Sequence, residues 1–350
     1  MASSPAAVEG LDLGALRAWL DAEVPGRFDG DLSASLITGG KSNLTYAVSN
    51  GDHDVIVRRP PLGHVLATAH DMGREHRIMA ALAATPVPVP VMIAECTDTA
   101  VIGAPFYVME RVTGSAFQHA SDLEPLGPER TRAITERLVD TLVDLHAVDY
   151  AAVGLGDFGR PDGYLDRQVA RWKKQLDASR SREVRGIDEL ADRLSSTVPA
   201  SSDGTIVHGD YRLDNVLVDT TVPAGEGGDR ITAVLDWEMS TLGDPLTDLA
   251  VMLAYHHLAL DAGGSGQVTD APRAPGYLTP DEVVERYASR SGRDVGELGF
   301  HLGLAYFKLA VILEGIYFRY TQGKTLGAGF EGIGAMIDPL VQHGLAATAE

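Results

Sequence analysis

Apolar residues recur along the first third of the chain in two different spacings. Residues 12–21 and 72–82 carry them at the three- and four-residue intervals of an amphipathic helix. Residues 36–48 and 54–60 instead alternate apolar and polar positions, with glycines inside the first stretch. That alternation predicts two strands around a turn, followed by a further strand. This part of the chain is therefore expected to combine a β-sheet with short helices.

A different pattern follows a proline-rich connector at residues 85–92. One more strand is expected from residue 105, and it ends in a polar bend near residue 112. From about residue 128 to residue 148 the apolar spacing is strongly helical. The sequence thus predicts an N-terminal lobe over residues 1–112 and a mainly helical lobe over residues 113–350.

Residues 301–319 form the most apolar run of the chain. Lys308, Glu314 and Arg319 interrupt it, which favours a buried helix over a membrane span. Charges on so apolar a helix are costly to bury unless they are paired or functional. These three residues are therefore candidates either for contacts with a substrate or for structural ion pairs.

Candidate catalytic and metal-binding residues cluster after the middle of the chain, around a predicted hairpin. Two short apolar runs, Val216–Val218 and Ile231–Leu235, flank turn-forming residues and predict a β-hairpin. Asp210 and Asn215 precede the first strand, and Asp236 follows the second. Because an antiparallel hairpin brings those ends together, two carboxylates and a carboxamide are expected in one loop region. Hard oxygen ligands of this kind suit Mg²⁺.

The spacing of these residues meets the needs of phosphoryl transfer. Kinase-like enzymes use an Asp to orient the acceptor hydroxyl, and an Asn and a second Asp to hold the metal ions. The catalytic loop of protein kinases places its Asn five residues after the catalytic Asp, as in Asp210 and Asn215 here. The sequence therefore predicts a kinase-like catalytic loop.

His208-Gly-Asp-x-x-x-x-Asn215 followed by Leu235-Asp-Trp-Glu238 resembles the aminoglycoside phosphotransferase/choline kinase family, a branch of the protein-kinase-like fold. Within that family, Gly39-Gly-Lys-Ser-Asn43, Val57-Arg-Arg-Pro-Pro61 and Glu314-Gly-Ile-Tyr-x-Arg319 are closest to the phosphotransferase-like domain joined to some acyl-CoA dehydrogenases. The resemblance implies an α+β, bilobal fold with a small antiparallel sheet in the N-terminal lobe and a larger helical C-terminal lobe. It also implies that ATP and Mg²⁺ bind between the lobes.

The resemblance assigns roles by position. Asp210 should accept or orient the proton of the substrate hydroxyl, and Arg212 stands where kinases place a lysine that touches the γ-phosphate. Asn215 and Asp236 should ligate Mg²⁺. His208 should hold the loop by hydrogen bonds, since a zinc site there would need further His or Cys ligands close by and none is apparent.

The glycine turn between the first two strands consists of Gly39, Gly40, Lys41, Ser42 and Asn43. Its backbone N–H groups are predicted to approach the phosphates. Gly40-Lys-Ser also suggests a P-loop, but that motif needs glycine at position 35, where this chain has Ser35. A P-loop also needs a following helix, where alternation here indicates a strand. The turn is therefore interpreted as a phosphate lid on a β-hairpin.

Kinases place a lysine on their third strand, but this chain has no lysine between Lys41 and Lys173. Arg58 occupies the corresponding strand end, and arginine holds phosphate with a different, bidentate geometry. Glu75, on the following helix, is the natural partner of Arg58. A surface arginine at a strand end and an ordinary helix-surface carboxylate are the alternatives.

The family resemblance places the hinge between the lobes near Glu110, Arg111 and Val112, whose backbone groups would hold adenine. Asp157-Phe-Gly159 spells the metal motif of protein kinases, but it precedes the catalytic loop, so a turn is expected there. Asp248 is interpreted as a brace for the catalytic loop.

Charge and composition narrow the partners. The chain carries 49 acidic and 29 basic residues, a formal charge of −20, which argues against nucleic acid or an anionic membrane as a partner. Acidic surfaces mostly keep proteins soluble, and a cationic substrate is the alternative reading. Cys96 is the one cysteine, which excludes an internal disulfide and fits a reducing cytosol. With no signal peptide visible, a cytoplasmic monomer or homodimer is expected.

Three functions remain open from the sequence. The complete phosphoryl-transfer set favours a kinase that moves the γ-phosphate of ATP, with Mg²⁺, to a small-molecule hydroxyl. The subgroup resemblance implies a hydroxylated metabolite such as a hydroxyacyl-CoA. Phosphorylation of aminoglycosides is the second function; it predicts dense carboxylates beside Asp210, and residues 342–350 offer few. A catalytically silent nucleotide-binding module is the third, with Arg58 in the lysine's place in its favour.

Overall fold

The structure, a computed structural model, describes residues 8–37, 43–63, 70–200, 203–222, 227–261, 269–324, 330 and 332–349. The chain divides into two compact units. Unit 1 comprises residues 1–113 and 232–238, and unit 2 comprises residues 114–231 and 239–350. The predicted division after residue 112 lies one residue before the first of these boundaries. Inclusion of residues 232–238 in unit 1 is a feature that the sequence did not reveal.

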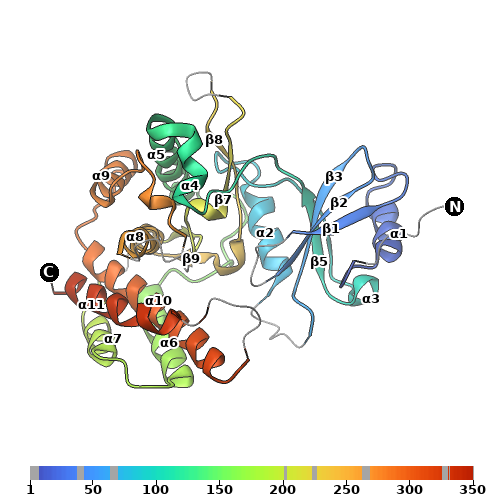
Figure 1. Cartoon of the computed structure of the whole chain (residues 1–350). Coiled ribbons are helices and arrows are strands. Elements are labelled where there is room, and N and C mark those ends of the chain that lie inside the picture. Colours follow the sequence, from blue (N-terminus) through green and yellow to red (C-terminus); the bar gives the residue numbers. More distant parts are fainter. Residues whose placement is uncertain are drawn as a thin grey trace. The chain divides into compact units, whose positions relative to one another are not determined.

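Helices, strands and a few short 3₁₀ turns make up the described chain, and Figure 1 labels most of the helices and strands. The strands are β1 (Ser33–Leu36), β2 (Leu44–Ser49), β3 (Asp54–Arg59), β4 (Met92–Cys96), β5 (Phe106–Glu110), β6 (Thr205–Val207), β7 (Val216–Asp219), β8 (Arg230–Val234) and β9 (Thr241–Gly243). The helices are α1 (Leu13–Glu23), α2 (Met72–Leu82), α3 (Thr99–Ile102), α4 (Ala120–Leu123), α5 (Gly127–His146), α6 (Tyr164–Ser179), α7 (Ile187–Ser196), α8 (Leu246–Asp261), α9 (Pro280–Ser291), α10 (Leu298–Thr321) and α11 (Ile337–Ala347).

Unit 1 is built on a five-stranded antiparallel sheet with the strand order β1-β2-β3-β5-β4. Because successive side chains on a strand point to opposite faces, each face of the sheet packs against a different helix. Tyr46 and Val57 belong to a core that includes side chains of α1 and α3. Arg58 and Tyr107 point to the other face, where both contact Glu75 of α2.

Residues 232–238 join unit 1 through hydrogen bonds to its earlier segments. The Thr232 hydroxyl donates to the Thr113 carbonyl at 2.9 Å, and the Val234 N–H donates to the Pro88 carbonyl at 2.8 Å. The predicted hairpin is confirmed, since β7 and β8 form a two-stranded sheet. Asp236, directly after β8, therefore belongs to unit 1.

Unit 2 is mainly helical, with α10 at its centre. This helix packs against α6, α7, α8 and α11, whereas α5 packs against α9. β6 pairs with β9 in antiparallel register, with Ile206 opposite Leu242. Because β6 ends at Val207, this pairing fixes the start of the predicted catalytic loop.

Most of the patterned stretches lie where the sequence places them, but the first strand of the stretch predicted over residues 36–48 lies earlier, at Ser33–Leu36. The helix predicted over residues 72–82 is α2, and residues 128–148 correspond to α5. β1 and β2 pair antiparallel on either side of the glycine turn, so the strand that excludes a P-loop is present. Residues 157–159 lie in a turn and bend rather than in a metal loop.

In the part of the chain that the structure describes, α10 is the one helix long and apolar enough to cross a membrane, with a mean hydropathy of 1.4. Of its most apolar window, 72% is buried inside the protein, which fits the predicted buried helix. Glu314, fully buried on α10, accepts hydrogen bonds from the Ser181 N–H and hydroxyl and lies 3.3 Å from Arg182 Nε. Glu314 is therefore a structural ion-pair residue, and Arg319 is exposed.

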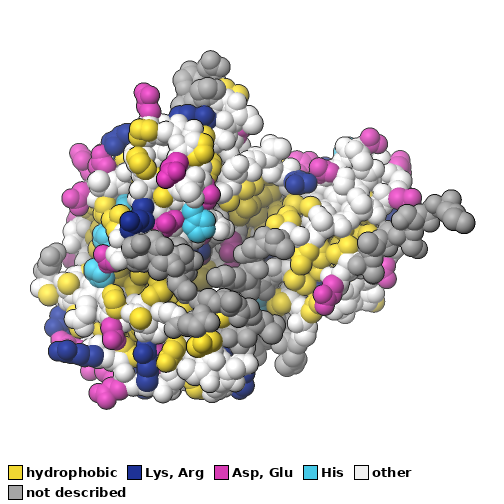
Figure 2. All heavy atoms as spheres, in the orientation of Figure 1, with side chains coloured by type: hydrophobic (Ala, Val, Ile, Leu, Met, Phe, Trp, Pro, Cys, Tyr) yellow, Lys and Arg dark blue, Asp and Glu magenta, His cyan; other side chains and the backbone are white. Residues whose placement is uncertain are grey.

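Acidic and basic side chains are scattered over the face of the molecule shown in Figure 2, and no continuous basic patch is visible there. This distribution fits the interpretation of the negative charge as a solubilising surface.

His256 on α8 gives unit 2 a predictable acid sensitivity. Its imidazole is buried and packs edge-on against Tyr277, with ring centres 5.3 Å apart. Burial, aided by the neighbouring His257, lowers the pKa of His256 from 6.5 to about 4. The folded state binds a proton at His256 less readily than the unfolded state does. The contribution of the neutral imidazole to stability is therefore complete above pH 6.5 and is lost as the pH falls towards 4.

We expect unit 2 to lose about 2 kcal/mol of stability from this residue between pH 7 and pH 5. His256→Phe, which keeps an aromatic ring beside Tyr277, should remove that loss. Hydrogen exchange of α8, corrected for the intrinsic pH dependence of the amides, measures it. Equal acid sensitivity in the variant and the wild type would contradict the assignment.

Candidate active site

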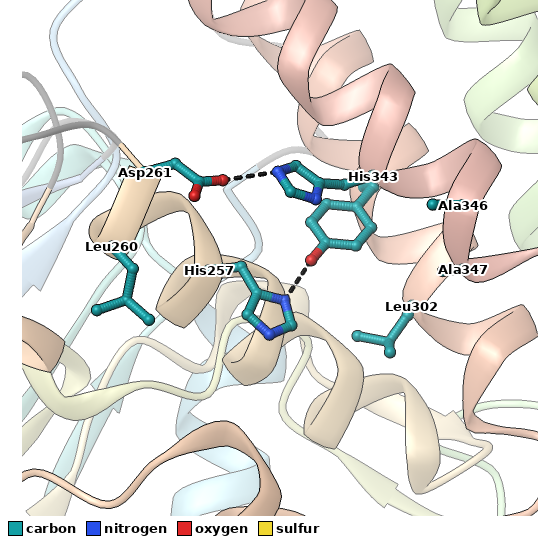
Figure 3. Close-up of a pocket in the computed structure, with 8 residues that line it drawn as sticks. His257, Leu260, Asp261, Leu302, His343, Ala346 and Ala347 are labelled. Carbon is teal, nitrogen blue, oxygen red and sulfur yellow. Dashed lines mark hydrogen bonds and ion pairs between the residues drawn. The ribbon is translucent and has the colours of Figure 1, made fainter.

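A cavity of about 300 Å³ lies among α8, α10 and α11 of unit 2 (Figure 3). The rings of His257, Tyr306 and His343 line it in near-parallel planes, 17–23° apart. His257 Nδ1 is hydrogen-bonded to the Tyr306 hydroxyl, and His343 Nε2 lies 2.6 Å from Asp261 Oδ2. These groups are paired with one another, and no residue predicted for phosphoryl transfer lines the cavity.

The second residue of the predicted catalytic loop, Gly209, lies at a position that strongly favours glycine. Gly209 has a φ of +88°, and a Cβ there would meet Met239 Cβ at 2.8 Å and its carbonyl oxygen at 2.9 Å. The buried carboxylate of Asp248 accepts hydrogen bonds from the N–H groups of His208 and Gly209, both at 2.7 Å. Asp248 thus lies where a brace for the loop is predicted.

A second layer fixes Asp248 itself. His146 Nε2 lies 3.3 Å from Asp248 Oδ2, and His146 Nδ1 lies 2.8 Å from the Tyr287 hydroxyl. Burial raises the pKa of Asp248, but the hydrogen bond and charge of His146 outweigh it, so the pKa lies below its ordinary value. The carboxylate therefore remains charged and keeps both loop N–H groups bonded.

Asp210 and Asn215 are brought together by a 3₁₀ turn over Leu213–Asn215. Asn215 Nδ2 donates to the Asp210 carbonyl at 2.8 Å and to Asp210 Oδ2 at 3.1 Å. With its nitrogen bonded inside the loop, the Asn215 side chain keeps its Oδ1 as the atom that a metal ion could use. The arrangement fits the predicted role of Asn215.

A magnesium site here would depend on the nucleotide. Among the described residues, no group of three or more His, Cys, Asp or Glu side chains is arranged to hold a metal ion. Mg²⁺ is usually held by one or two protein groups together with waters and substrate phosphates. Asn215 in unit 2 and Asp236 in unit 1 fit that chemistry, and their action on one ion stays a prediction.

Arg212 is engaged by carboxylates of its own loop. Its Nε lies 3.4 Å from Asp210 Oδ2 and its Nη1 lies 3.0 Å from Asp214 Oδ2. The guanidinium also stacks 4.4 Å from the centre of the Tyr255 ring. Burial and the charge of Asp210 raise the pKa of Tyr255, so its hydroxyl stays protonated beside that carboxylate. Arg212 thus orients Asp210, while its contact with a γ-phosphate stays a prediction.

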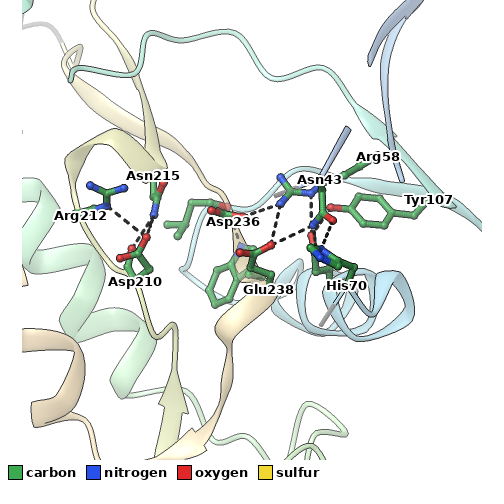
Figure 4. Close-up of polar contacts among 12 residues, drawn as sticks. Asn43, Arg58, His70, Tyr107, Asp210, Arg212, Asn215, Asp236 and Glu238 are labelled. Carbon is green, nitrogen blue, oxygen red and sulfur yellow. Dashed lines mark hydrogen bonds and ion pairs between the residues drawn. The ribbon is translucent and has the colours of Figure 1, made fainter. Parts of the chain in front are cut away.

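Arg58 is the centre of a polar cluster in unit 1 (Figure 4). Its Nε lies 3.1 Å from Glu75 Oε2, and its Nη2 lies 2.6 Å from Asp236 Oδ1. The Tyr107 hydroxyl donates to Glu75 Oε2 at 2.9 Å. The Arg58 side chain is 14% exposed, so it is not a surface arginine, and Glu75 is its partner as expected.

Asn43, the last residue of the predicted lid, belongs to the same cluster. Its Nδ2 donates to Glu75 Oε1 at 3.0 Å and to Glu238 Oε2 at 3.2 Å, while its Oδ1 lies 2.8 Å from His70 Nδ1. His70, Tyr107 and Glu238 were not expected from the sequence as members of this cluster. The other predicted lid residues, Gly39, Gly40, Lys41 and Ser42, lie outside the described residues.

Two acidic residues of the cluster are in unfavourable environments: Asp236 has a strained backbone, and Glu75 is a buried carboxyl group. Asp236 has a φ of +66°, a left-handed conformation that only one other non-glycine residue of the described chain adopts. Such strained backbone is concentrated at functional sites. Burial raises the pKa of Glu75 to about 7, against the opposing effects of Arg58 and Tyr107. The positive charge of Arg58 therefore compensates two carboxylates at once.

The predicted hinge segment follows β5 in unit 1. The Glu110 N–H donates to the Val91 carbonyl at 2.9 Å, and the Arg111 N–H donates to the Asp54 carbonyl at 3.3 Å. These two N–H groups are thus engaged within unit 1. Recognition of adenine by the backbone of Glu110, Arg111 and Val112 stays a prediction.

Arg58→Met is expected to weaken nucleotide binding by about ten-fold, or 1.4 kcal/mol, because it removes the cation that stands in the place of the kinase lysine. It should also destabilise unit 1, since Glu75 would remain buried without its partner. Titration with ATP and Mg²⁺, together with an unfolding curve, measures both effects.

The adjacent Arg59 provides a matched control. It points to the opposite face of β3 and donates to the Gly10 and Ile102 carbonyls at 2.5 and 2.9 Å. Arg59→Met should therefore lower stability and leave the nucleotide affinity of the folded protein unchanged. Equal losses of affinity in the two variants would contradict a nucleotide role for Arg58.

Comparison with known families identifies the class of protein. The model of the phosphotransferase enzyme family, APH, matches residues 33–282, a span that contains Arg58, Asp210, Asn215 and Asp236. The chain belongs to this phosphotransferase family. The predicted kinase-like α+β fold, with a small antiparallel sheet and a helical remainder, is confirmed.

Individual relatives refine that placement. A solved structure from Ralstonia eutropha, provisionally described as an aminoglycoside phosphotransferase, is 35% identical with a TM-score of 0.83, over 97% of this chain and 98% of its own. Choline kinase from Cryptosporidium parvum is 12% identical with a TM-score of 0.65, over 97% and 96% of the two chains, and shares the fold. Acyl-CoA dehydrogenase family member 11 of Gallus gallus is 34% identical over 96% of this chain. This chain covers 43% of that relative's length.

Proposed function

We propose that this phosphotransferase uses ATP and Mg²⁺ to phosphorylate a hydroxyl group of a small molecule, with Asp210 as the base. The observation that carries the proposal is the pair formed with Asn215, whose nitrogen is bonded to Asp210 and whose oxygen remains for a metal. Asp210 would take the proton of the acceptor hydroxyl as the γ-phosphoryl group is transferred. Asn215 and Asp236 would hold Mg²⁺, which neutralises charge on the phosphates.

Solved structures of this fold support the use of a nucleotide together with a small acceptor. An APH(4)-Ia variant was solved as a ternary complex with AMP-PNP and hygromycin B, and APH(2″)-IIa as a streptomycin–ATP complex. Each is 14% identical to this chain, so they support the binding mode through the fold and leave the acceptor open.

The charges beside Asp210 favour a neutral or anionic acceptor over an aminoglycoside. Arg212 lies against Asp210, and the ammonium of Lys308 is bonded to the preceding residue, Gly209. The neighbouring carboxylate, Asp214, is already paired with Arg212. A polycationic aminoglycoside would need unpaired carboxylates at this position.

A hydroxyacyl-CoA is the acceptor that these observations and the relatives support together. The curated relatives in which a similar segment occurs are named as acyl-CoA dehydrogenase family members, and this chain covers 43% of the chicken and human proteins. An enzyme that acts beside an acyl-CoA dehydrogenase would meet hydroxylated acyl thioesters of coenzyme A. The phosphates of the coenzyme A part make these acceptors anionic.

A catalytically silent nucleotide-binding module is the second candidate. The observation in its favour is Arg58, whose guanidinium is engaged by Glu75 and Asp236 rather than presented alone to a phosphate. Such a protein would bind ATP without forming ADP.

Mass spectrometry with separate acceptor panels distinguishes these candidates. The protein is incubated with ATP and Mg²⁺ and with either hydroxyacyl-CoAs or aminoglycosides, beside an Asp210→Ala control. A phosphorylated hydroxyacyl-CoA that is absent in the control supports the proposal. A phosphorylated aminoglycoside would overturn the proposed acceptor, and bound nucleotide without any product would favour the silent module.

We further propose that the protein is cytoplasmic, is a monomer or homodimer, and has neither nucleic acid nor a membrane as a partner. The formal charge of −20 and the scattered basic side chains in Figure 2 support this view. Light scattering of the purified protein, with and without nucleotide, tests the assembly state; a stable larger oligomer would contradict it.

A further inference from the structure

Lys308 is a buried lysine in the middle of α10, with 7% of its surface exposed. Its Nζ donates to the Gly209 carbonyl at 2.6 Å and lies 5.8 Å from the centre of the Trp172 ring. Burial lowers the pKa of Lys308, and the charges of Asp210 and Asp248 oppose that shift. A methionine of similar length would fill this space without desolvating a charge, so packing alone does not account for a lysine here.

The peptide group that Lys308 contacts is the one that leads into Asp210. The N–H of Gly209 is held by Asp248 Oδ1 at 2.7 Å, and its carbonyl is held by Lys308 at 2.6 Å. Gly209 has no side chain that could add a further anchor, and its backbone has a φ of +88° between these two contacts. Rotation of this peptide would turn the Asp210 side chain away from its present direction.

The next contact along the backbone strengthens the same loop. The Asp210 N–H donates to His208 Nδ1 at 3.3 Å, which completes a run of bonded peptide groups from His208 to Asp210. Lys308 adds a cationic contact to this run, from a helix about a hundred residues further along the chain. It therefore ties the catalytic loop to α10, the helix that packs against α6, α7, α8 and α11.

We propose that Lys308 is a positioning residue for phosphoryl transfer: it holds the Gly209 carbonyl and places a positive charge beside Asp210, so that the carboxylate of Asp210 faces the acceptor. This inference rests on the proposed function, in which Asp210 is the base. It assigns one of the three charges of α10 to the active site, whereas Glu314 serves a structural ion pair.

Lys308→Met and Glu314→Gln form a matched pair for the test. Both variants remove a buried charge from α10, but Glu314 bonds to Ser181 and Arg182, away from the catalytic loop. Per folded molecule, Lys308→Met should lower kcat by about 10- to 100-fold, the cost of misplacing a reacting group by about 1 Å. The KM values for nucleotide and acceptor should stay within about two-fold of the wild type, since positioning of a base is needed only in the transition state.

Chemical rescue separates the charge from the volume of the side chain. Lys308→Ala leaves space beside the Gly209 carbonyl that a small primary alkylamine could occupy, and an alcohol of equal length serves as the control. Recovery of kcat with amines but not with alcohols is the expected result. Full activity of Lys308→Met, the same loss of kcat in Glu314→Gln, or rescue by alcohols and amines alike would overturn the inference.

Hydrogen exchange keeps this test independent of the proposed function. If the wild-type protein phosphorylates no acceptor in the same assay, the proposed function fails, and the backbone part of the inference is still measurable. Exchange of the amides in residues 205–215 should be faster in Lys308→Met and unchanged in Glu314→Gln. Unchanged exchange in Lys308→Met would overturn the positioning role on its own.

Discussion

Asp210→Asn is expected to abolish phosphoryl transfer while leaving nucleotide binding intact. The substitution keeps the size of the side chain and an oxygen for Asn215 Nδ2, but it removes the group that takes the proton. General bases contribute about 10²- to 10⁴-fold to enzymatic rates, so kcat should fall about 1,000-fold. ADP release measures kcat, and calorimetric titration with ATP and Mg²⁺ should give an affinity within about two-fold of the wild type.

Asp214→Asn is the matched control for this prediction. Asp214 lies in the same loop and shares the guanidinium of Arg212 with Asp210, at 3.0 Å against 3.4 Å. Its loss should disturb Arg212 in a similar way and lower kcat by less than about ten-fold, because the base itself remains. Comparable losses in the two variants would contradict the assignment of Asp210 as the base.

Asp236→Asn is expected to remove the dependence of nucleotide binding on Mg²⁺. In the wild type, affinity for ATP should rise by at least about ten-fold when Mg²⁺ is added, which corresponds to about 1.4 kcal/mol. In the variant, a bound metal would lose the carboxylate that we assign as its ligand, while asparagine tolerates the left-handed backbone of this position. Arg58 would keep Glu75 at 3.1 Å and Glu238 at 4.0 Å but would lose its nearest carboxylate, so binding without Mg²⁺ should be unchanged or stronger.

Glu238→Gln, two residues further on, controls for a general loss of negative charge in this segment. Glu238 accepts from Asn43 at 3.2 Å and lies 4.0 Å from Arg58 Nη2. Its amide should preserve the Mg²⁺ dependence. A titration in which Asp236→Asn keeps the wild-type response to Mg²⁺ would remove Asp236 from the metal site.

Most of the correct predictions came from the spacing of residues within a single loop or strand. Asp210 and Asn215 are five residues apart in one loop, so a single turn is enough to bring them within hydrogen-bond distance. Strand alternation likewise decides which side chains share a face of β3, and it places Arg58 with Glu75 rather than in the core against α1. These features depend on a few consecutive residues and on regular backbone geometry.

Contacts between distant segments could not be predicted in the same way. Lys308 and Glu314 interrupt an apolar helix, which signals that partners exist, but the pattern does not say that one bonds to Gly209 and the other to Ser181. Tyr107 looks like an ordinary strand residue, although it donates to the buried Glu75. Such pairings depend on packing across many residues, which periodicity does not encode.

The residues that flank Arg212 in the sequence carry a signal about its contacts. It stands between two acidic residues, Asp210 and Asp214, each two positions away, and both pair with it in the structure. A guanidinium flanked in this way is available to its own loop before any ligand arrives. The position alone suggested a phosphate contact, whereas the neighbouring charges indicated an orienting role for Asp210.

The measurement that tests the central claim most directly uses ATP labelled with heavy oxygen on its γ-phosphoryl group. Wild-type protein and Asp210→Asn are each incubated with the labelled ATP, Mg²⁺ and a metabolite extract, and the products are analysed by mass spectrometry. The account predicts a hydroxylated metabolite that gains one labelled phosphoryl group with the wild type and not with the variant. Labelled inorganic phosphate alone, or a labelled product formed equally by both proteins, would contradict transfer by an Asp210-dependent phosphotransferase.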